Sequence, residues 1–184
     1  RLPGDAGPGS GAPAARPPSG PGVPKGLPQN AAAVLLGGRV RARYAKHHLP
    51  NYGVFDEFRI FVPGEGLTVV RVRGVDVALA ICEDLWQDGG PVDAVRAAGA
   101  GLLLVLNGSP YEAGKDGVRL DLLRRRAMAA GCPLAYVNLV GGQDDLVFDG
   151  GSVVVSPGGE VLARAERFTE ELLVVDLDLA DAEP

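Results

Sequence analysis

The feature that most constrains this chain is an apolar run over residues 75–81, which ends at Cys82 and is followed by the acids Glu83 and Asp84. A run of this length and composition is typical of a strand that is buried on both faces. The carboxyl end of such a strand lies at the rim of an α/β sheet, where reacting groups are commonly placed. The run therefore predicts a nucleophilic Cys82, although a free cysteine is more often an inert core residue.

The bulk composition narrows the possible partners. The chain has 184 residues and a formal net charge of −5, and its basic residues cluster only at positions 124–126, so nucleic acid is not expected as a partner. No apolar run approaches the roughly 18 residues of a membrane span, so a membrane is not expected either. The two cysteines, Cys82 and Cys132, are too few for a disulfide framework, which indicates a reducing cytoplasm.

The chain divides into three parts. Residues 1–28 are rich in proline and glycine and are predicted to form a flexible segment or a surface loop. Residues 29–180 carry the periodic apolar pattern of one folded domain, and residues 181–184 form a tail. Because the chain begins with Arg1 and its only methionine is Met128, we expect it to be part of a longer protein.

The pattern of the folded part predicts a mixed α/β layered domain. A glycine pair at 37–38 indicates a hairpin turn, and residues 141–145 are predicted to form a loop. The clearest helix, over residues 118–130, turns Leu120 and Leu123 inward and the arginines outward. A short helix follows Pro91. Strands are predicted over residues 30–36, 39–46, 67–72, 75–82, 101–106, 134–140, 152–155, 161–165 and 172–177.

Lys46 is the second unusual residue. Strand alternation places it on the same side as Val40, Ala42 and Tyr44, which is the apolar side. Its ordinary interpretation is a solvated strand end. A buried ammonium beside a thiol could instead promote the thiolate and stabilise the oxyanion of an acyl-transfer intermediate. The same alternation sends Glu83 to the side opposite Cys82, which predicts a structural role for Glu83.

Two other kinds of site are not predicted. His47 and His48 are adjacent in an extended segment and therefore point in opposite directions, and the sequence has no second cluster of cysteine and histidine, so a metal site is not expected. Neither a G-x-G-x-x-G dinucleotide fingerprint nor a G-x-x-x-x-G-K-[ST] phosphate loop occurs. No cofactor is therefore expected in this chain.

Five segments together resemble a known family. Residues 44–57 read YAKHHLPNYGVFDE, residues 80–86 read AICEDLW, and shorter matches are NGSPY at 107–111, GGQD at 141–144 and FDG at 148–150. These closely resemble the glutaminase domains of glutamine-dependent NAD synthetases, in particular the actinobacterial form, within the nitrilase (carbon–nitrogen hydrolase) superfamily. The resemblance covers about residues 28–180 and implies a nitrilase-type α-β-β-α sandwich, incomplete at the N-terminus.

The resemblance also implies roles for individual residues. Cys82 matches the nucleophile and Lys46 the lysine of a Glu-Lys-Cys triad, while Tyr52, Ser109 and Lys115 match positions that hold the substrate L-glutamine. The general-base glutamate of the family lies upstream of the lysine, and residues 1–30 contain no counterpart. We therefore expect this chain alone to show little or no glutaminase turnover.

The implied activity belongs to a larger protein. Ammonia released from glutamine would serve the ATP-dependent amidation of deamido-NAD to NAD in a synthetase domain that this chain lacks, and ATP and Mg would bind there. The full-length protein is expected to be a homo-oligomer. Two alternatives stay open, namely a stand-alone nitrilase-type amidase acting on another small amide and a non-catalytic fragment.

Overall fold

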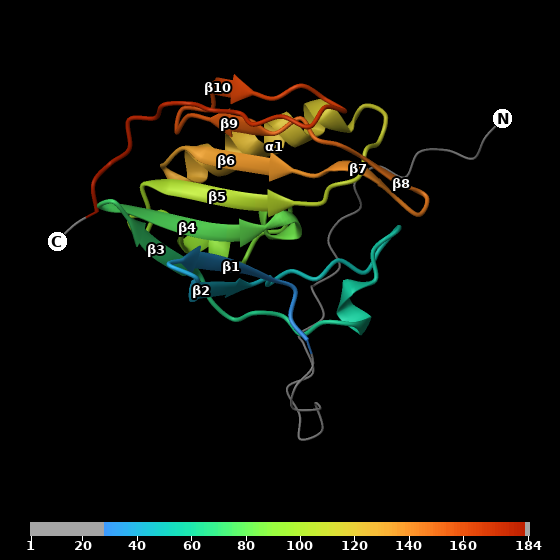
Figure 1. The fold of residues 1–184 in the computed structure, drawn as a ribbon, viewed down its shortest axis with the longest axis horizontal. Helices are drawn as coiled ribbons and strands as arrows, with labels where there is room; N and C mark the ends of the chain where they lie inside the picture. Colours follow the sequence, from blue (N-terminus) through green and yellow to red (C-terminus); the bar gives the residue numbers. More distant parts are fainter. Residues whose placement is uncertain (1–27, 183–184) are drawn as a thin grey trace, which may run out of the picture.

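The structure is a computed structural model that describes residues 28–182, so the predicted flexible segment 1–28 lies almost entirely outside the described residues (Figure 1). A six-stranded mixed sheet forms the centre, in the order β10-β9-β6-β5-β4-β3. One helix, α1 (Lys115–Ala130), packs on one face of this sheet, and the hairpin of β1 (Ala31–Leu36) and β2 (Arg39–Ala45) packs on the other.

Three neighbouring parallel strands set the position of the site. They are β4 (Val75–Ile81), β5 (Leu102–Asn107) and β6 (Leu134–Asn138). Ile81 is in register with Leu106, and Asn107 with Asn138, so the three strands end at nearly the same level. The residues that follow these strands therefore meet at one edge of the sheet.

Both faces of the central strands are apolar, as their near-continuous hydrophobic sequences predict. On one face Leu103, Val105 and Tyr136 join the core beneath α1. On the other face Val77, Leu79 and Ile81 pack with Tyr44 of β2. Because side chains alternate along a strand, β4 contributes residues to the core on each face of the sheet. Its contacts with Tyr44 hold the β1–β2 hairpin on the face opposite α1.

The remaining elements complete the edges. Strand β3 (Thr68–Val72) pairs antiparallel with β4, and β9 (Val153–Val155) joins β6 to β10 (Val161–Arg164). Strands β7 (Val140–Gln143) and β8 (Leu146–Asp149) form a separate hairpin. Short 3₁₀ segments lie at η1 (Glu57–Arg59), η2 (Cys82–Leu85) and η3 (Pro91–Ala94).

The structure corrects two local predictions of secondary structure. Residues 141–145, predicted as a loop, lie largely in the β7–β8 hairpin, where two glycines occupy strand positions. Residues 172–177, predicted as a strand, are extended without a strand partner among the described residues, and Leu172 and Val174 are 89% and 79% exposed. Apolar composition alone thus did not specify a strand partner for this segment.

The helix α1 differs from the prediction in which arginines it buries. Arg119 and Arg126 lie on its covered face, whereas the prediction placed the arginines in solvent. Arg126 donates hydrogen bonds from Nε to the Leu85 carbonyl oxygen at 2.6 Å and from Nη2 to that of Gln87 at 2.5 Å. A buried guanidinium that satisfies carbonyl groups at the end of η2 and just beyond it therefore ties the helix to the segment that follows Cys82.

Candidate active site

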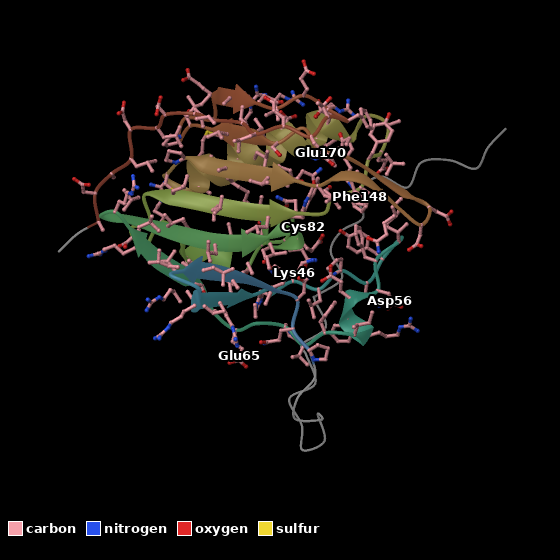
Figure 2. All side chains as sticks on the ribbon, in the orientation of Figure 1. Lys46, Asp56, Glu65, Cys82, Phe148 and Glu170 are labelled. Atoms are coloured by element: carbon pink, nitrogen blue, oxygen red, sulfur yellow. The ribbon has the colours of Figure 1, made fainter. Side chains whose placement is uncertain are left out.

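A pocket of about 350 Å³ opens at the carboxyl ends of β4 and β5, beside the end of β2. Cys82 and Lys46 both line it, although 35 residues of chain lie between them (Figure 2). The structure therefore brings together the two residues that the sequence predicted as nucleophile and triad lysine. The described residues that line the pocket are Asn30, Ala31, Ala32, Lys46, Phe55, Glu57, Ile81, Cys82, Leu106, Asn107 and Gly108.

Cys82 sits at a sharp turn. Strand β4 ends at Ile81, and Cys82 begins η2 with a φ of 42°, a left-handed conformation that costs a non-glycine residue on the order of 1–3 kcal/mol. This turn ends the strand alternation, so the prediction that Glu83 lies on the side opposite Cys82 was wrong in its reasoning. Glu83 is nevertheless an anchor, because it accepts hydrogen bonds from the Tyr52 hydroxyl at 2.8 Å and from Gln87 Nε2 at 2.9 Å.

Lys46 is buried, as its position in the strand pattern predicted, with a side chain 2% exposed. Its Nζ lies 2.7 Å from Glu57 Oε1, and the other oxygen of Glu57 accepts a hydrogen bond from Asn30 Nδ2 at 3.2 Å. A buried ammonium requires such a partner, since an unpaired charge in the interior is costly. Glu57 therefore fixes the direction in which the Lys46 side chain points.

The surroundings of Cys82 shift the pKa of its thiol in opposite directions. Burial raises the pKa of the Cys82 thiol above its ordinary value, and the charges of Glu83 and Glu57 raise it further, while the ammonium groups of Lys46 and Lys115 oppose the shift. The net direction is upward, so the thiol is protonated at neutral pH. Within residues 28–182 no carboxylate hydrogen-bonds the sulfur. A proton acceptor is therefore needed before Cys82 can attack.

Two of the predicted substrate-binding residues lie around the nucleophile without lining the pocket. The hydroxyl of Tyr52 donates to Glu83, the neighbour of Cys82; burial and this hydrogen bond raise the pKa of Tyr52. Nζ of Lys115 lies 3.7 Å from Glu112 Oε2 and 5.9 Å from the centre of the Trp86 ring. Their contact with glutamine stays a prediction.

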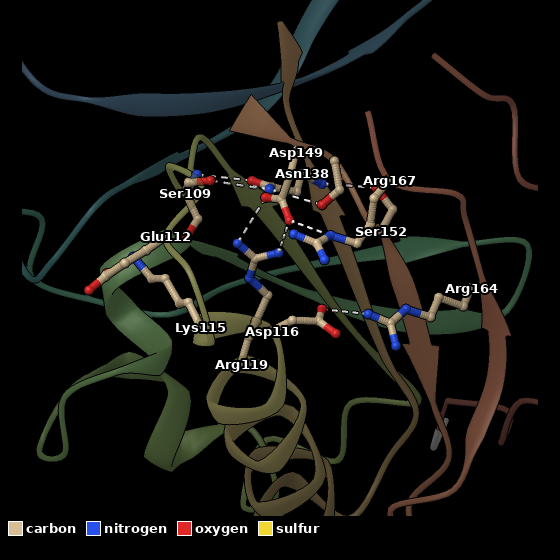
Figure 3. A network of polar contacts seen from close by, with 11 residues as sticks. Ser109, Glu112, Lys115, Asp116, Arg119, Asn138, Asp149, Ser152, Arg164 and Arg167 are labelled. Carbon is tan, nitrogen blue, oxygen red and sulfur yellow. Dashed lines mark hydrogen bonds and ion pairs between the residues drawn. The ribbon is translucent and has the colours of Figure 1, made fainter. Parts of the chain in front are cut away.

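Ser109, the third predicted substrate residue, is 3% exposed and follows the pocket residue Gly108. Its backbone N–H donates to Asn138 Oδ1 at 2.9 Å, and Asn138 Nδ2 donates back to the Ser109 carbonyl oxygen at 3.3 Å (Figure 3). Beside this pair Arg119 reaches from α1 to Asp149, which also accepts from Arg167 Nε at 2.9 Å. The loop at Ser109 is thus held by a buried polar network.

Sequence reasoning assigned no role to Glu57, although the residue lies inside the segment 44–57 that carries the family resemblance. The signal was available, because a lysine predicted on a buried face needs a nearby acid, and Glu57 and Asp56 are the first acids after it. Which of the two acids Lys46 contacts depends on how the loop between Lys46 and Asp56 folds. That choice is visible only in three dimensions.

Among residues 28–182, no group of three or more histidine, cysteine, aspartate or glutamate side chains is arranged to hold a metal ion. The same residues include no helix long and apolar enough to cross a membrane.

The sequence of this chain matches the family described as Carbon-nitrogen hydrolase over residues 21–184. The chain therefore belongs to the carbon–nitrogen hydrolase family, whose members include the nitrilase-type enzymes, and the predicted α/β fold of that family is confirmed. The glutamine-dependent NAD(+) synthetase of Aquifex aeolicus is 48% identical to it over 153 residues, which cover 83% of this chain and 27% of that protein.

Solved structures similar to this chain include a synthetase of the same kind and an amidase. The glutamine-dependent NAD+ synthetase of Acinetobacter baumannii, in complex with adenosine diphosphate, is 43% identical with a TM-score of 0.74, covering 78% of this chain and 27% of that one. A mutant amidase of Nesterenkonia sp. AN1, with the acetamide moiety of fluoroacetamide added covalently at its active-site cysteine, is 39% identical with a TM-score of 0.60, covering 70% and 47%. This chain spans about a quarter of the length of the curated relatives it matches.

Proposed function

We propose that this chain is the cysteine-bearing part of a glutaminase that hydrolyses the side-chain amide of L-glutamine. The observation that carries the proposal is the convergence of Cys82 and Lys46 on one pocket at the end of the parallel strands. The similarity to glutamine-dependent NAD(+) synthetases over most of the chain supports glutamine as the substrate.

In the proposed reaction the Cys82 sulfur attacks the amide carbon of glutamine. The Lys46 ammonium stabilises the oxyanion that develops on the amide oxygen, where preorganised charge is worth several kcal/mol. The thiol proton passes through a base to the nitrogen, ammonia leaves, and a glutamyl thioester forms at Cys82. Water then attacks the thioester carbon, which releases glutamate and returns the thiol.

Glu57 has a supporting part in this proposal. It pairs with Lys46 at 2.7 Å and fixes the position of the ammonium group that would stabilise the oxyanion. Tyr52, Ser109 and Lys115 are proposed to hold the amino-acid end of glutamine. We also propose that this chain alone turns over slowly, because the pKa of Cys82 is raised and no described carboxylate hydrogen-bonds the thiol.

The proposal extends to the longer protein that the relatives represent. The ammonia would be used in the ATP-dependent amidation of deamido-NAD to NAD, with ATP and Mg bound in a separate synthetase domain. We propose that the full-length protein is a homo-oligomer in the cytoplasm, a reducing compartment in which Cys82 and Cys132 both stay free thiols. Coupling the two sites would deliver ammonia before water protonates it.

One alternative has an observation in its favour. The amidase of Nesterenkonia sp. AN1 carries an acetamide moiety from fluoroacetamide at its cysteine, so a related fold accepts a small aliphatic amide. A stand-alone amidase would not need the positively charged Lys115 near Cys82, whereas a substrate with an α-carboxylate would. This contrast favours glutamine.

The test is covalent labelling of the chain with a diazoketone analogue of glutamine, followed by mass spectrometry of the two cysteine peptides. We expect labelling at Cys82 to exceed labelling at Cys132 by at least about tenfold, with slower labelling in Lys46→Met. Fluoroacetamide is the matched probe for the alternative. Equal labelling of the two cysteines would favour a non-catalytic fragment, and a preference for fluoroacetamide would favour a simple amidase.

A further inference from the structure

Asp84 is the most highly connected buried acid in the described part of the chain. Its side chain is fully buried, at 0% exposure, and its carboxylate accepts four hydrogen bonds. A carboxylate has about four acceptor positions, so these bonds use its whole capacity. Such complete satisfaction offsets the cost of burying the charge and fixes the geometry of every donor.

The four donors come from the two segments that carry the catalytic pair. Oδ2 accepts from the Tyr44 hydroxyl at 2.7 Å and from the Ile81 backbone N–H at 3.1 Å. Oδ1 accepts from the backbone N–H groups of His47 at 3.1 Å and His48 at 2.9 Å. One carboxylate therefore links the end of β2 with the end of β4.

The donors flank Lys46 and Cys82 directly. Tyr44 lies in β2 two residues before Lys46, which directly follows the strand and is also buried, and His47 follows Lys46 at once. Ile81 immediately precedes Cys82. Burial and the negative charge of Asp84 raise the pKa of Tyr44 well above its ordinary value, so its hydroxyl stays protonated and remains a donor.

We propose that Asp84 is a positioning residue, which sets the placement of the Lys46 ammonium relative to the Cys82 thiol by holding the backbone on either side of both. The inference rests on the proposed function, in that it assigns Asp84 to the same site, but its physical content is the relation between Lys46 and Cys82. It predicts that loss of Asp84 weakens the effect of Lys46 on the thiol.

The variant Asp84→Asn keeps the size of the side chain and replaces one oxygen by an amide nitrogen. That nitrogen cannot accept, so two of the four donors lose their partner. The readout is the rate of Cys82 alkylation by iodoacetamide as a function of pH, measured on the whole chain by peptide mass spectrometry. This probe needs no glutamine binding, so its result stands even if glutamine is not the substrate.

We expect the pH midpoint of Cys82 alkylation to move upward in Asp84→Asn. The alkylation rate below that midpoint should fall about tenfold, which is the effect of one pKa unit. Lys46→Met should have a similar effect, and the double variant should be no slower than the slower single variant. The other groups that act on the thiol stay in place, namely Glu57, Glu83 and Lys115.

Leu123→Ala is the control for stability, because it opens a cavity in the core beneath α1 but keeps Asp84 and all four of its donors, and it should leave the midpoint unchanged. An unchanged midpoint in folded Asp84→Asn, or rate losses that multiply in the double variant, would overturn the proposal. If Asp84→Asn does not fold, Tyr44→Phe decides, since it removes a single donor. A shift in the same direction then supports the proposal, and an unshifted midpoint overturns it.

Discussion

Replacing Asp149 by asparagine is expected to destabilise this chain strongly. Asp149 lies at the end of β8 and is 1% exposed. Its carboxylate accepts hydrogen bonds from Arg119 Nη2 at 3.2 Å and from Arg167 Nε at 2.9 Å. Burial raises the pKa of the Asp149 carboxyl, but the two guanidinium groups outweigh it and hold that pKa below its ordinary value.

The size of the effect follows from what the substitution leaves behind. Arg119 is 2% exposed, and its Nε already lacks a hydrogen-bond partner. In Asp149→Asn the buried guanidinium loses its counter-charge and one of its two acceptor oxygens, and the Tyr136 ring, 5.8 Å away, cannot replace them. Removing one partner of a buried pair typically costs about 3–5 kcal/mol. With a urea dependence of roughly 2 kcal/mol per molar, the unfolding midpoint should fall by about 2 M.

The measurement is equilibrium urea unfolding followed by circular dichroism, with Asp121→Asn as the matched control. Asp121 pairs with Arg124 on the surface of α1, at side-chain exposures of 79% and 44%, and such pairs contribute at most about 1 kcal/mol. A free-energy loss in Asp149→Asn within about 1 kcal/mol of that in Asp121→Asn would refute the reasoning. It would mean that the buried network contributes no more than a surface pair.

Four further predictions concern stability at low pH, the packing of the core, the space around Gly64 and the reactivity of Cys132. Because the pKa of Asp149 is lowered on folding, its ionic contribution is fully present above about pH 4 and is lost as the pH falls, so the stability gap to Asp149→Asn should shrink in urea titrations at pH 3. Leu123→Ala should cost about 2–5 kcal/mol of unfolding free energy, whereas Val174→Ala, at a residue 79% exposed, should stay within about 0.5 kcal/mol. Gly64→Ala would press Cβ against the Ala45 carbonyl oxygen and should lower the melting temperature measurably, unlike Gly66→Ala, where nothing lies within 4 Å. Burial raises the pKa of the Cys132 thiol to about 11, so its alkylation at pH 8 should be slow in the folded chain and fast in urea.

Most of the strands and the burial of Lys46 could be predicted from the sequence. A near-continuous apolar run identified the strand that leads to Cys82, and alternation placed Lys46 on the buried side at the end of β2. The structure confirms the strand and the burial of Lys46. Alternation suffices because successive side chains of a strand must point to opposite faces. The strand predicted over the apolar residues 172–177 is absent, since such a segment also needs a neighbouring strand to become part of a sheet.

Buried charges were the weakest part of the sequence prediction. The arginine run at 124–126 suggested a solvated helix face, yet Arg126 is 4% exposed and donates hydrogen bonds to the carbonyl oxygens of Leu85 and Gln87. An arginine is predicted to be exposed from its residue type alone, because burying its charge without partners is costly. The partners here lie about 40 residues away in the sequence, so no local window contains them.

The sequence by itself determined the order of the strands' apolar runs, the turn residues between them and the placement of Cys82 at a strand end, because backbone geometry and side-chain alternation act over a few residues. Only the tertiary structure decided that Lys46 meets Glu57, that Asp84 joins the ends of β2 and β4, and that Arg119 lies against Asp149. Those contacts depend on which distant segments are brought together when both faces of the sheet are buried. That choice is a property of the whole chain.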